Sequence, residues 1–393
     1  MYDEIKNELT NHIIPFWNAL ADRVNGGFYG YMSHDLKIDG GYDKGTVLHS
    51  RILWFYSNCY LVLKEPVCLE MARHCYDFAV KNCVDREYGG VYWSVKFDGT
   101  AAETMKHGYC QAFFIYALAS YYDASGDESA LGLATEIFNA VEEKLSDGVS
   151  YREACTREWG DRENDELSEN NIAAEKTMNT VLHLIEAYTE LYRVRKDERV
   201  AERLEFLLSL TYEKIYDKEN ARLLVFFDKD MNVRGNIHSY GHDIEAAWLM
   251  GRALDIAGDA LPRELRGNVR AMNRALAEKI RGSAFDGDAM NYESVSGVVN
   301  TARVWWAQAE ALTGFLDAYR LYGEERFLEK ARGLWAYIKS KIIDARAGGE
   351  WHSQVDKNGV PAKMPVVDEW KCPYHNGRMC LMAISVYDAV TPR

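Results

Sequence analysis

The 393-residue chain lacks long apolar runs and has little positive charge. No apolar stretch approaches the roughly 20 residues that span a bilayer, so we expect no membrane segment. Basic residues number 46 against 60 acidic ones, and the net charge of -14 argues against nucleic acid and anionic lipid as partners, because both attract basic patches. Residues 1–10 are charged and lack the apolar core of a secretion signal, so we expect a cytoplasmic protein.

Familiar cofactor and metal motifs are also absent. None of the eight cysteines forms a CxxC pair, there is no HExxH, and no GxGxxG opens a strand–helix unit. Most cysteines lie in apolar, helix-like stretches, and we expect them to be reduced and buried. We therefore expect no cofactor and no metal ion.

What the sequence does contain is a recurring turn rich in glycine and aromatic residues. Each copy alternates apolar and polar residues over a few positions, which is typical of a short strand or hairpin. The copies recur every roughly 60 residues, so the chain contains an internal repeat. They span residues 26–31, 88–93, 147–151, 222–229, 286–292 and 348–352.

Helical patterns lie in pairs between these copies, about twelve helices in all. The first helix of a pair is amphipathic, as in residues 197–214, and the second is apolar nearly all round, as in residues 110–118. A helix that is apolar on every side is buried on every side, so the second members should form an inner ring and the first members an outer ring. The pattern predicts an all-α fold, an (α/α)6 barrel with short β-hairpins between helix pairs. An open solenoid of helix hairpins is the alternative.

No boundary rich in proline, glycine or serine divides the chain, and its seven prolines are scattered. We therefore expect a single catalytic domain over residues 1–393.

Polar residues gather near the starts of the predicted inner helices. In a barrel these helices are parallel, so their first turns share one mouth, and side chains from distant parts of the sequence converge there. Spacings of three or four residues, as in Asn179 and His183, place both side chains on one helix face. The residues concerned are His49, Ser50, Arg51, His107, Tyr109, Asn179, His183, His242, Glu245, Trp305, Trp306, Glu310, Trp370 and His375.

The pair His238 and His242 allows two interpretations. Histidines four residues apart on a helix are spaced as metal ligands. The interpretation we favour makes Glu245 the acidic partner that orients His242, since a carboxylate fixes a histidine tautomer and raises its pKa.

Trp305-Trp306 and Arg51 also leave two interpretations open. The tryptophans are either core residues or a flat platform for a sugar ring. Arg51 is either a structural ion-pair member or a clamp with several donors for sugar oxygens.

The sequence resembles the N-acylglucosamine 2-epimerase superfamily and, within it, the cellobiose 2-epimerases. The resemblance covers essentially the whole chain and depends on five segments, residues 48–55, 176–187, 238–245, 303–310 and 370–378.

The resemblance implies an (α/α)6 barrel that interconverts glucose and mannose at the reducing end of a sugar without a cofactor. The implied substrates are β-1,4-linked: cellobiose, lactose and short oligosaccharides. His242 and His375 are implied as the general acid/base pair, with His183 as a third essential histidine. We expect substrate contacts from Arg51, Tyr109, Asn179, Glu245, Trp306, Glu310 and Trp370. We favour a monomer.

The chemistry is consistent with these residue types. Inverting C2 of an aldose requires ring opening, removal of the C2 proton to give an enediolate, and return of a proton to the other face. Histidine suits both proton steps because its ordinary pKa is near roughly 6.5, and Arg51 with Asn179 suits the developing oxyanion.

Competing functions remain open at this stage. An N-acylglucosamine 2-epimerase or an aldose–ketose isomerase would use the same enediolate. A glycoside hydrolase would use Glu245 and Glu310 as the two carboxylates that flank the scissile bond. A helical-repeat scaffold would have no enzymatic activity.

Overall fold

The structure, a computed structural model, describes residues 1–164 and 174–390. The α-helices are α1 (Tyr2–Glu8), α2 (Ile14–Ala19), α3 (Thr46–Leu63), α4 (Pro66–Asn82), α5 (Gly108–Ser125), α6 (Glu128–Lys144), α7 (Met178–Arg195), α8 (Glu198–Leu210), α9 (Tyr240–Ala257), α10 (Arg263–Ser283), α11 (Trp305–Tyr322), α12 (Glu325–Tyr337) and α13 (Tyr374–Val390). Short π-helical turns continue three outer helices, η1 (Leu9–Ile13), η2 (Thr211–Ile215) and η4 (Ile338–Ile342), and a 3-10 turn, η3 (Gly258–Ala260), follows α9.

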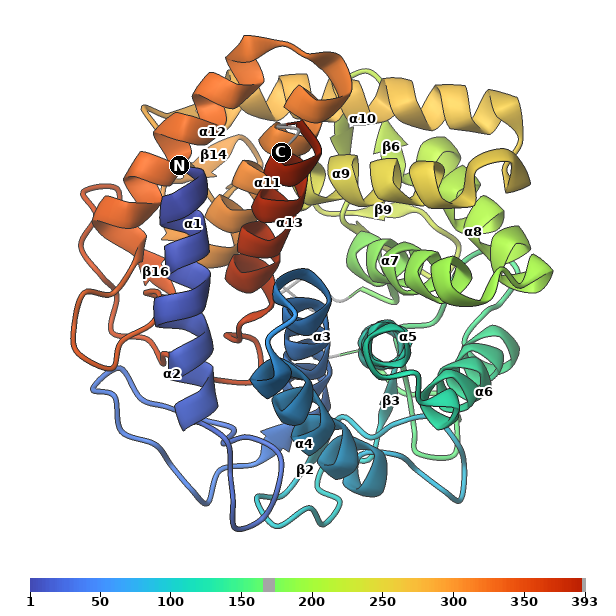
Figure 1. The fold of residues 1–393 in the computed structure, drawn as a ribbon. Helices are drawn as coiled ribbons and strands as arrows, with labels where there is room; N and C mark the ends of the chain where they lie inside the picture. The colour runs from blue at the N-terminus through green and yellow to red at the C-terminus, as the bar shows by residue number, and fades with distance from the viewer. Residues whose placement is uncertain (165–173, 391–393) are drawn as a thin grey trace.

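Because α1, η1 and α2 are continuous, the described residues form twelve helices in two rings. The inner ring is α3, α5, α7, α9, α11 and α13. Each of these helices contacts the next, and α13 contacts α3, so the ring closes (Figure 1). The predicted (α/α)6 barrel is confirmed, and the closing contact rules out the open solenoid.

Sequence pattern explains which helix lies in which ring. In α5 every residue from Gly108 to Tyr121 is buried, whereas α10 buries little more than a stripe that includes Met272, Leu276 and Ile280. Asp127 and Asp197 directly precede outer helices α6 and α8. Their side chains accept the backbone N–H two residues on, which stabilises the helix starts as N-caps.

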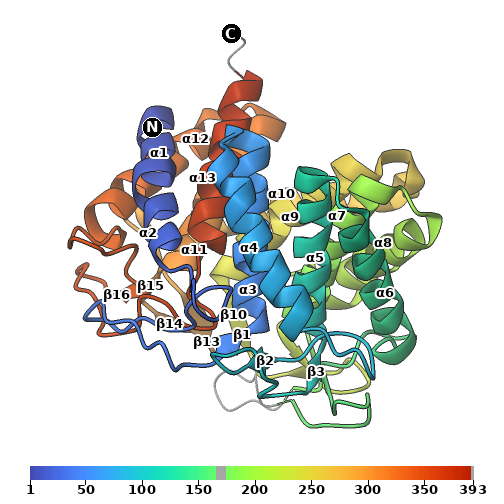
Figure 2. The ribbon, with the colours of Figure 1, turned by 60° about the horizontal axis from the view of Figure 1, so that its bottom comes forward.

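The strands are β1 (Lys44–Gly45), β2 (Ser94–Val95), β3 (Lys106–His107), β4 (Ala154–Cys155), β5 (Lys176–Thr177), β6 (Tyr216–Asp217), β7 (Arg222–Leu223), β8 (Phe226–Phe227), β9 (Val233–Arg234), β10 (Ile237–Ser239), β11 (Phe285–Asp286), β12 (Ala289–Met290), β13 (Glu293–Val295), β14 (Val298–Asn300), β15 (Arg303–Val304) and β16 (Gln354–Val355). They gather at one end of the barrel (Figure 2). All six predicted hairpins follow outer helices, either as strand pairs such as β6–β7 or as single bridges such as Ala21 with Phe28.

Strand pairing also joins neighbouring repeats, which the sequence did not predict. The strand before each inner helix pairs with the hairpin region of the next repeat, as in β1–β2, β3–β4, β5–β8, β10–β13 and β15–β16. The bridge between Met32 and Val367 completes the circle. This circle of short antiparallel pairs surrounds the end of the barrel at which the inner helices begin.

Two further expectations concern the membrane and the cysteines. Within the described parts of the chain no helix combines the length and the apolarity that crossing a bilayer requires. The eight cysteines are free and buried, as expected.

Candidate active site

The inner helices present their site residues at a common register. The second residue of a helix and the sixth residue lie one turn apart on the same face. That face carries polar or aromatic side chains at the second or sixth residue of all six inner helices. On the first five they are Arg51 on α3, Tyr109 on α5, Asn179 and His183 on α7, Glu245 on α9, and Trp306 and Glu310 on α11. On α13 it carries His375, the second residue.

Helix α9 departs from this register in an informative way. Its second residue is Gly241, and a Cβ atom there would lie 2.5 Å from the Trp306 ring, so only glycine allows this packing. The third residue, His242, lines the cavity instead and packs against the same ring at 4.7 Å between centroids.

These side chains surround a cavity of about 340 Å³, a size ordinary for a small-molecule site. The predicted residues that line it are Arg51, Tyr109, Asn179, His183, His242, Glu245, Trp305, Trp306, Trp370 and His375. Glu310 does not line the cavity: it is fully buried behind the wall, where it contacts His375. The sequence analysis missed Tyr292, Val304, Gln354 and Met364, which also line the cavity.

His375 is held from behind by a carboxylate. Its Nδ1 lies 2.7 Å from Oε1 of Glu310, whose other oxygen accepts a hydrogen bond from the Trp248 indole at 3.0 Å. If Nδ1 carries the hydrogen of this bond, Nε2 is free to act as a base. Burial lowers the pKa of His375 well below its ordinary value, and the nearby Arg51 and Arg378 lower it further.

His183 has the same arrangement with another carboxylate. Its Nδ1 lies 2.9 Å from Oε2 of Glu186, three residues along α7. Burial lowers the pKa of His183, and Glu186 opposes that shift. Burial alone would raise the pKa of Glu186, but Arg378 and His183 outweigh it and hold the value at about 2, so this group is an anion.

One buried guanidinium, Arg378 on α13, ties the carboxylates together. It donates to Glu186, to Glu245 at 2.5 Å and to Glu310 at 2.7 Å, and it is 1% exposed. Three carboxylates around one cation exceed its charge, and burial with the charge of Glu310 raises the pKa of Glu245. Glu186 and Arg378 lie within segments that carry the family resemblance, but nothing in the linear sequence pairs them.

His242 has a different partner from the one expected. Its Nδ1 lies 2.7 Å from the hydroxyl oxygen of Ser239, and Glu245 binds Arg378 instead. The prediction that Glu245 orients His242 is therefore wrong, because the α13 cation draws the carboxylate away. Burial lowers the pKa of His242 to about 3, and His183 adds to the shift.

Several polar atoms on the cavity wall have no partner in the described part of the chain. They include Oδ1 of Asn179 and Oε2 of Glu245. Buried polar atoms rarely stay unpaired, so these are positions at which a bound ligand would complete the hydrogen bonding. Arg51 is better satisfied: it donates to the Tyr109 hydroxyl at 2.5 Å and to the Trp370 carbonyl at 3.3 Å.

Some polar residues near the mouth are structural. His49 accepts a hydrogen bond from the Phe28 backbone, as Gln111 does from Val91 and Gln308 from Met290, and these bonds tie hairpins to inner helices. His107 caps the start of α5 through the Tyr109 N–H.

Two groups of residues in the described structure have the composition of a metal site, but both have other partners. His238 binds Asp243 at 2.7 Å and lines a different pocket from His242, so the two do not form a shared site. Atoms of Glu245, Glu310 and His375 lie within 4.8 Å of one another, as ligands would, but Arg378 already binds both carboxylates.

Comparisons with protein families, sequences and solved structures all match this chain to sugar epimerases. The N-acylglucosamine 2-epimerase (GlcNAc 2-epimerase) family profile matches residues 27–376. The chain is 51% identical to cellobiose 2-epimerase from Ruminococcus albus, covering 98% of both chains, and 44% identical to cellobiose 2-epimerase from Eubacterium cellulosolvens, covering 96% of both. The crystal structure of a sugar epimerase from a ruminal bacterium superimposes with a TM-score of 0.96 at 50% identity, covering 98% of both chains. The chain therefore belongs to the N-acylglucosamine 2-epimerase family.

Proposed function

We propose that the protein inverts C2 of the reducing-end glucose of β-1,4-linked disaccharides, converting cellobiose to glucosyl-mannose and lactose to epilactose. The main support for the proposal is that His183, His242 and His375 line one cavity together with Arg51. Cellobiose 2-epimerases about half identical over nearly the full chain support this choice of substrate.

His242 and His375 exchange the proton roles in this proposal. One ring takes the C2 proton of the open-chain sugar as a neutral base and becomes an imidazolium, and the other delivers to the opposite face a proton that it has taken up from solvent. The roles are reversed in the reverse reaction. Because burial lowers the pKa of both, each is neutral near pH 7 and ready to act as a base. His183, with its anionic partner Glu186, serves ring opening.

Arg51 stabilises the enediolate in this mechanism. It is 2% exposed, so its charge acts in a site with little water, and its contacts with Tyr109 and Trp370 hold it in place before the substrate arrives. Asn179 and Glu245 supply hydrogen bonds to sugar hydroxyls from atoms that otherwise lack a partner.

Trp306 and Trp370 supply apolar faces for the sugar rings. Trp306 packs against both His242 and His375, with centroid separations of 4.7 and 5.6 Å, so a ring stacked on its indole lies next to both proton carriers. Tyr109 packs against His183 on α7 and against Trp370 in the loop before α13.

The decisive experiment is incubation of the protein with cellobiose in deuterium oxide without added cofactor or metal. We expect glucosyl-mannose, with deuterium at C2 of the epimerised residue. Release of free glucose would indicate a hydrolase, and a ketose as the main product would indicate an aldose–ketose isomerase. Product that lacks deuterium after many turnovers contradicts the enediolate route.

Two further parts of the proposal concern the setting of the enzyme. We propose that it acts as a monomer in the cytoplasm, where its eight free, buried thiols would stay reduced. Light scattering of the purified protein tests the monomer, and a mass twice that of the chain contradicts it.

A further inference from the structure

An ion pair with a buried cation recurs at the mouth of the barrel in four of the six repeats. The two repeats that lead into α9 and α13 depart from this pattern: before α13 the corresponding residue is Cys372, and the adjacent Lys371 binds Glu350. The residue two positions before an inner helix is a cation in four repeats, and it binds the aspartate that begins the preceding hairpin. The pairs are Lys44 with Asp22 at 2.8 Å, Lys106 with Asp85 at 2.8 Å, Lys176 with Asp147 at 2.5 Å, and Arg303 with Asp286 at 3.2 Å. Before α9 the corresponding residue is His238.

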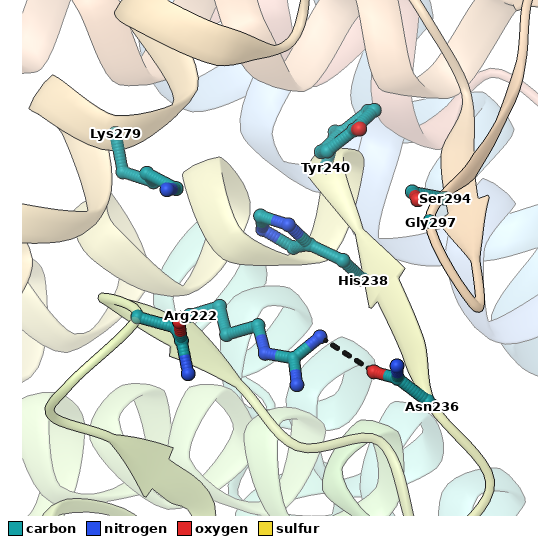
Figure 3. A pocket seen from close by; sticks show the side chains of 8 residues that line it. Arg222, Asn236, His238, Tyr240, Lys279, Ser294 and Gly297 are labelled. Carbon is teal, nitrogen blue, oxygen red and sulfur yellow. Dashed lines mark hydrogen bonds between the residues drawn. The ribbon is translucent and has the colours of Figure 1, made fainter.

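The shorter histidine does not bind the hairpin aspartate of its repeat. Its Nε2 lies 2.7 Å from Asp243 on α9, and Asp217 binds Arg222 from its own hairpin at 3.2 Å. Beside His238 there is a pocket of about 300 Å³ that is separate from the cavity of the catalytic histidines (Figure 3).

The lining of this pocket is rich in hydrogen-bond donors and cations. It includes Arg222, Asn236, His238, Tyr240, Lys279 and Ser294. None of the residues that line it is acidic, although acidic residues outnumber basic ones 60 to 46 in the chain. Figure 3 shows Lys279 and Arg222 approaching His238 from two sides, α10 and β7.

Lys279 is the feature that points to a ligand. No hydrogen bond or ion pair joins its ammonium group to any residue in the described parts of the chain, and it is only partly exposed. Arg222, in contrast, donates to both Asp217 and Asn236. The pocket therefore presents one uncompensated cation beside a fixed guanidinium, an arrangement that suits an anion with several oxygens.

We propose that this pocket binds a small oxyanion, the phosphate of a phosphate ester or the carboxylate of a sugar acid, between Lys279, Arg222 and His238. A neutral sugar has no charge to match the free ammonium group, and the chain's net charge of -14 makes a local cationic pocket distinctive.

The pocket is connected to the catalytic cavity through a short segment. His238 and Tyr240 line the pocket, and Ser239 between them contacts Nδ1 of His242 at 2.7 Å. An anion held by His238 therefore acts on the residues that orient His242, and we expect it to change the turnover number.

Calorimetric titration of the full chain tests the proposal independently of the enzymatic activity. The probes are inorganic phosphate, glucose 6-phosphate and gluconate, with glucose as the neutral control. We expect saturable binding of phosphate, and tighter binding of either glucose 6-phosphate or gluconate. In Lys279→Met the affinity for the tighter-binding anion should fall about tenfold or more. Lys81→Met, which removes an exposed lysine from α4, is the matched control and should bind as the wild type does.

A second variant gives this repeat the cation that four other repeats have at the same position. In His238→Lys the longer side chain should reach Asp217 and occupy the pocket, so we expect anion binding to be lost although Lys279 remains. The proposal is overturned if none of the three anions binds below about 10 mM, or if Lys279→Met binds them as tightly as Lys81→Met does. Turnover of cellobiose that is unchanged at saturating anion overturns the coupling to His242.

Discussion

His242 and His375 both pack against Trp306, but the structure holds their rings in different ways. Nδ1 of His375 contacts the Glu310 carboxylate, which Arg378 and Trp248 fix in turn. Nδ1 of His242 contacts the hydroxyl of Ser239, with no carboxylate on that atom among the described residues. A carboxylate stabilises the imidazolium that forms when a histidine takes a proton, whereas a hydroxyl orients the ring without compensating its charge. If both histidines carry protons as proposed, they should therefore depend unequally on their partners.

Removal of either ring should have the largest effect. We expect His242→Ala and His375→Ala each to lower kcat on cellobiose by about 1000-fold or more, because each removes a proton carrier. Circular dichroism should show unchanged helical content. His74→Ala, which removes a histidine bound to the Gly27 carbonyl outside the cavity, is the control and should keep nearly full activity. Retained turnover in either cavity variant refutes the assignment of that histidine.

Loss of the charge behind His375 should have the next largest effect. Glu310→Gln still accepts a hydrogen bond from Nδ1 but no longer compensates the imidazolium, so we expect kcat to fall about 100-fold with a smaller change in KM. Glu142→Gln is a matched control, since Glu142 is a carboxylate bound to Arg203 and Tyr188 away from the cavity. If the two variants behave alike, Glu310 is only a packing residue.

The sequence predicted most of the ring and much of the cavity wall. Apolar helices with polar first turns, such as α7 with Asn179 and His183, identify both the inner ring and the residues that face its mouth. The sequence could not separate His49 from Arg51, because the backbone group that His49 binds is 21 residues away and lies close only in the folded chain. Arg378 was missed for the same reason: its partners lie on α7, α9 and α11.

Spacing along a helix also misled the sequence analysis once. His242 and Glu245 are three residues apart, which allows contact, but an unforeseen cation on α13 competes for the carboxylate. Local spacing predicts which side chains share a face, and the choice among possible partners depends on the other helices that complete the cavity.

The hydroxyl behind His242 should matter least among the partners. We expect Ser239→Ala to lower kcat by less than about tenfold, because one neutral hydrogen bond contributes about 1 kcal/mol. Comparison of Ser239→Ala with Glu310→Gln in the same assay measures the asymmetry directly. A loss in Ser239→Ala as large as that in Glu310→Gln would remove the distinction between the two histidines.

The smallest effect should appear in the pH dependence of the wild-type enzyme. Burial lowers the pKa of His242 to about 3 and that of His375 well below its ordinary value, so both bases stay neutral as the pH falls through 6.5. Activity should be lost only when the pH falls through these lowered pKa values. We expect kcat/KM to change less than about threefold between pH 7 and pH 5, where an ordinary histidine base would lose about 25-fold. A half-maximal loss near pH 6.5, with helical content unchanged, would show that the base is an exposed histidine rather than either buried one.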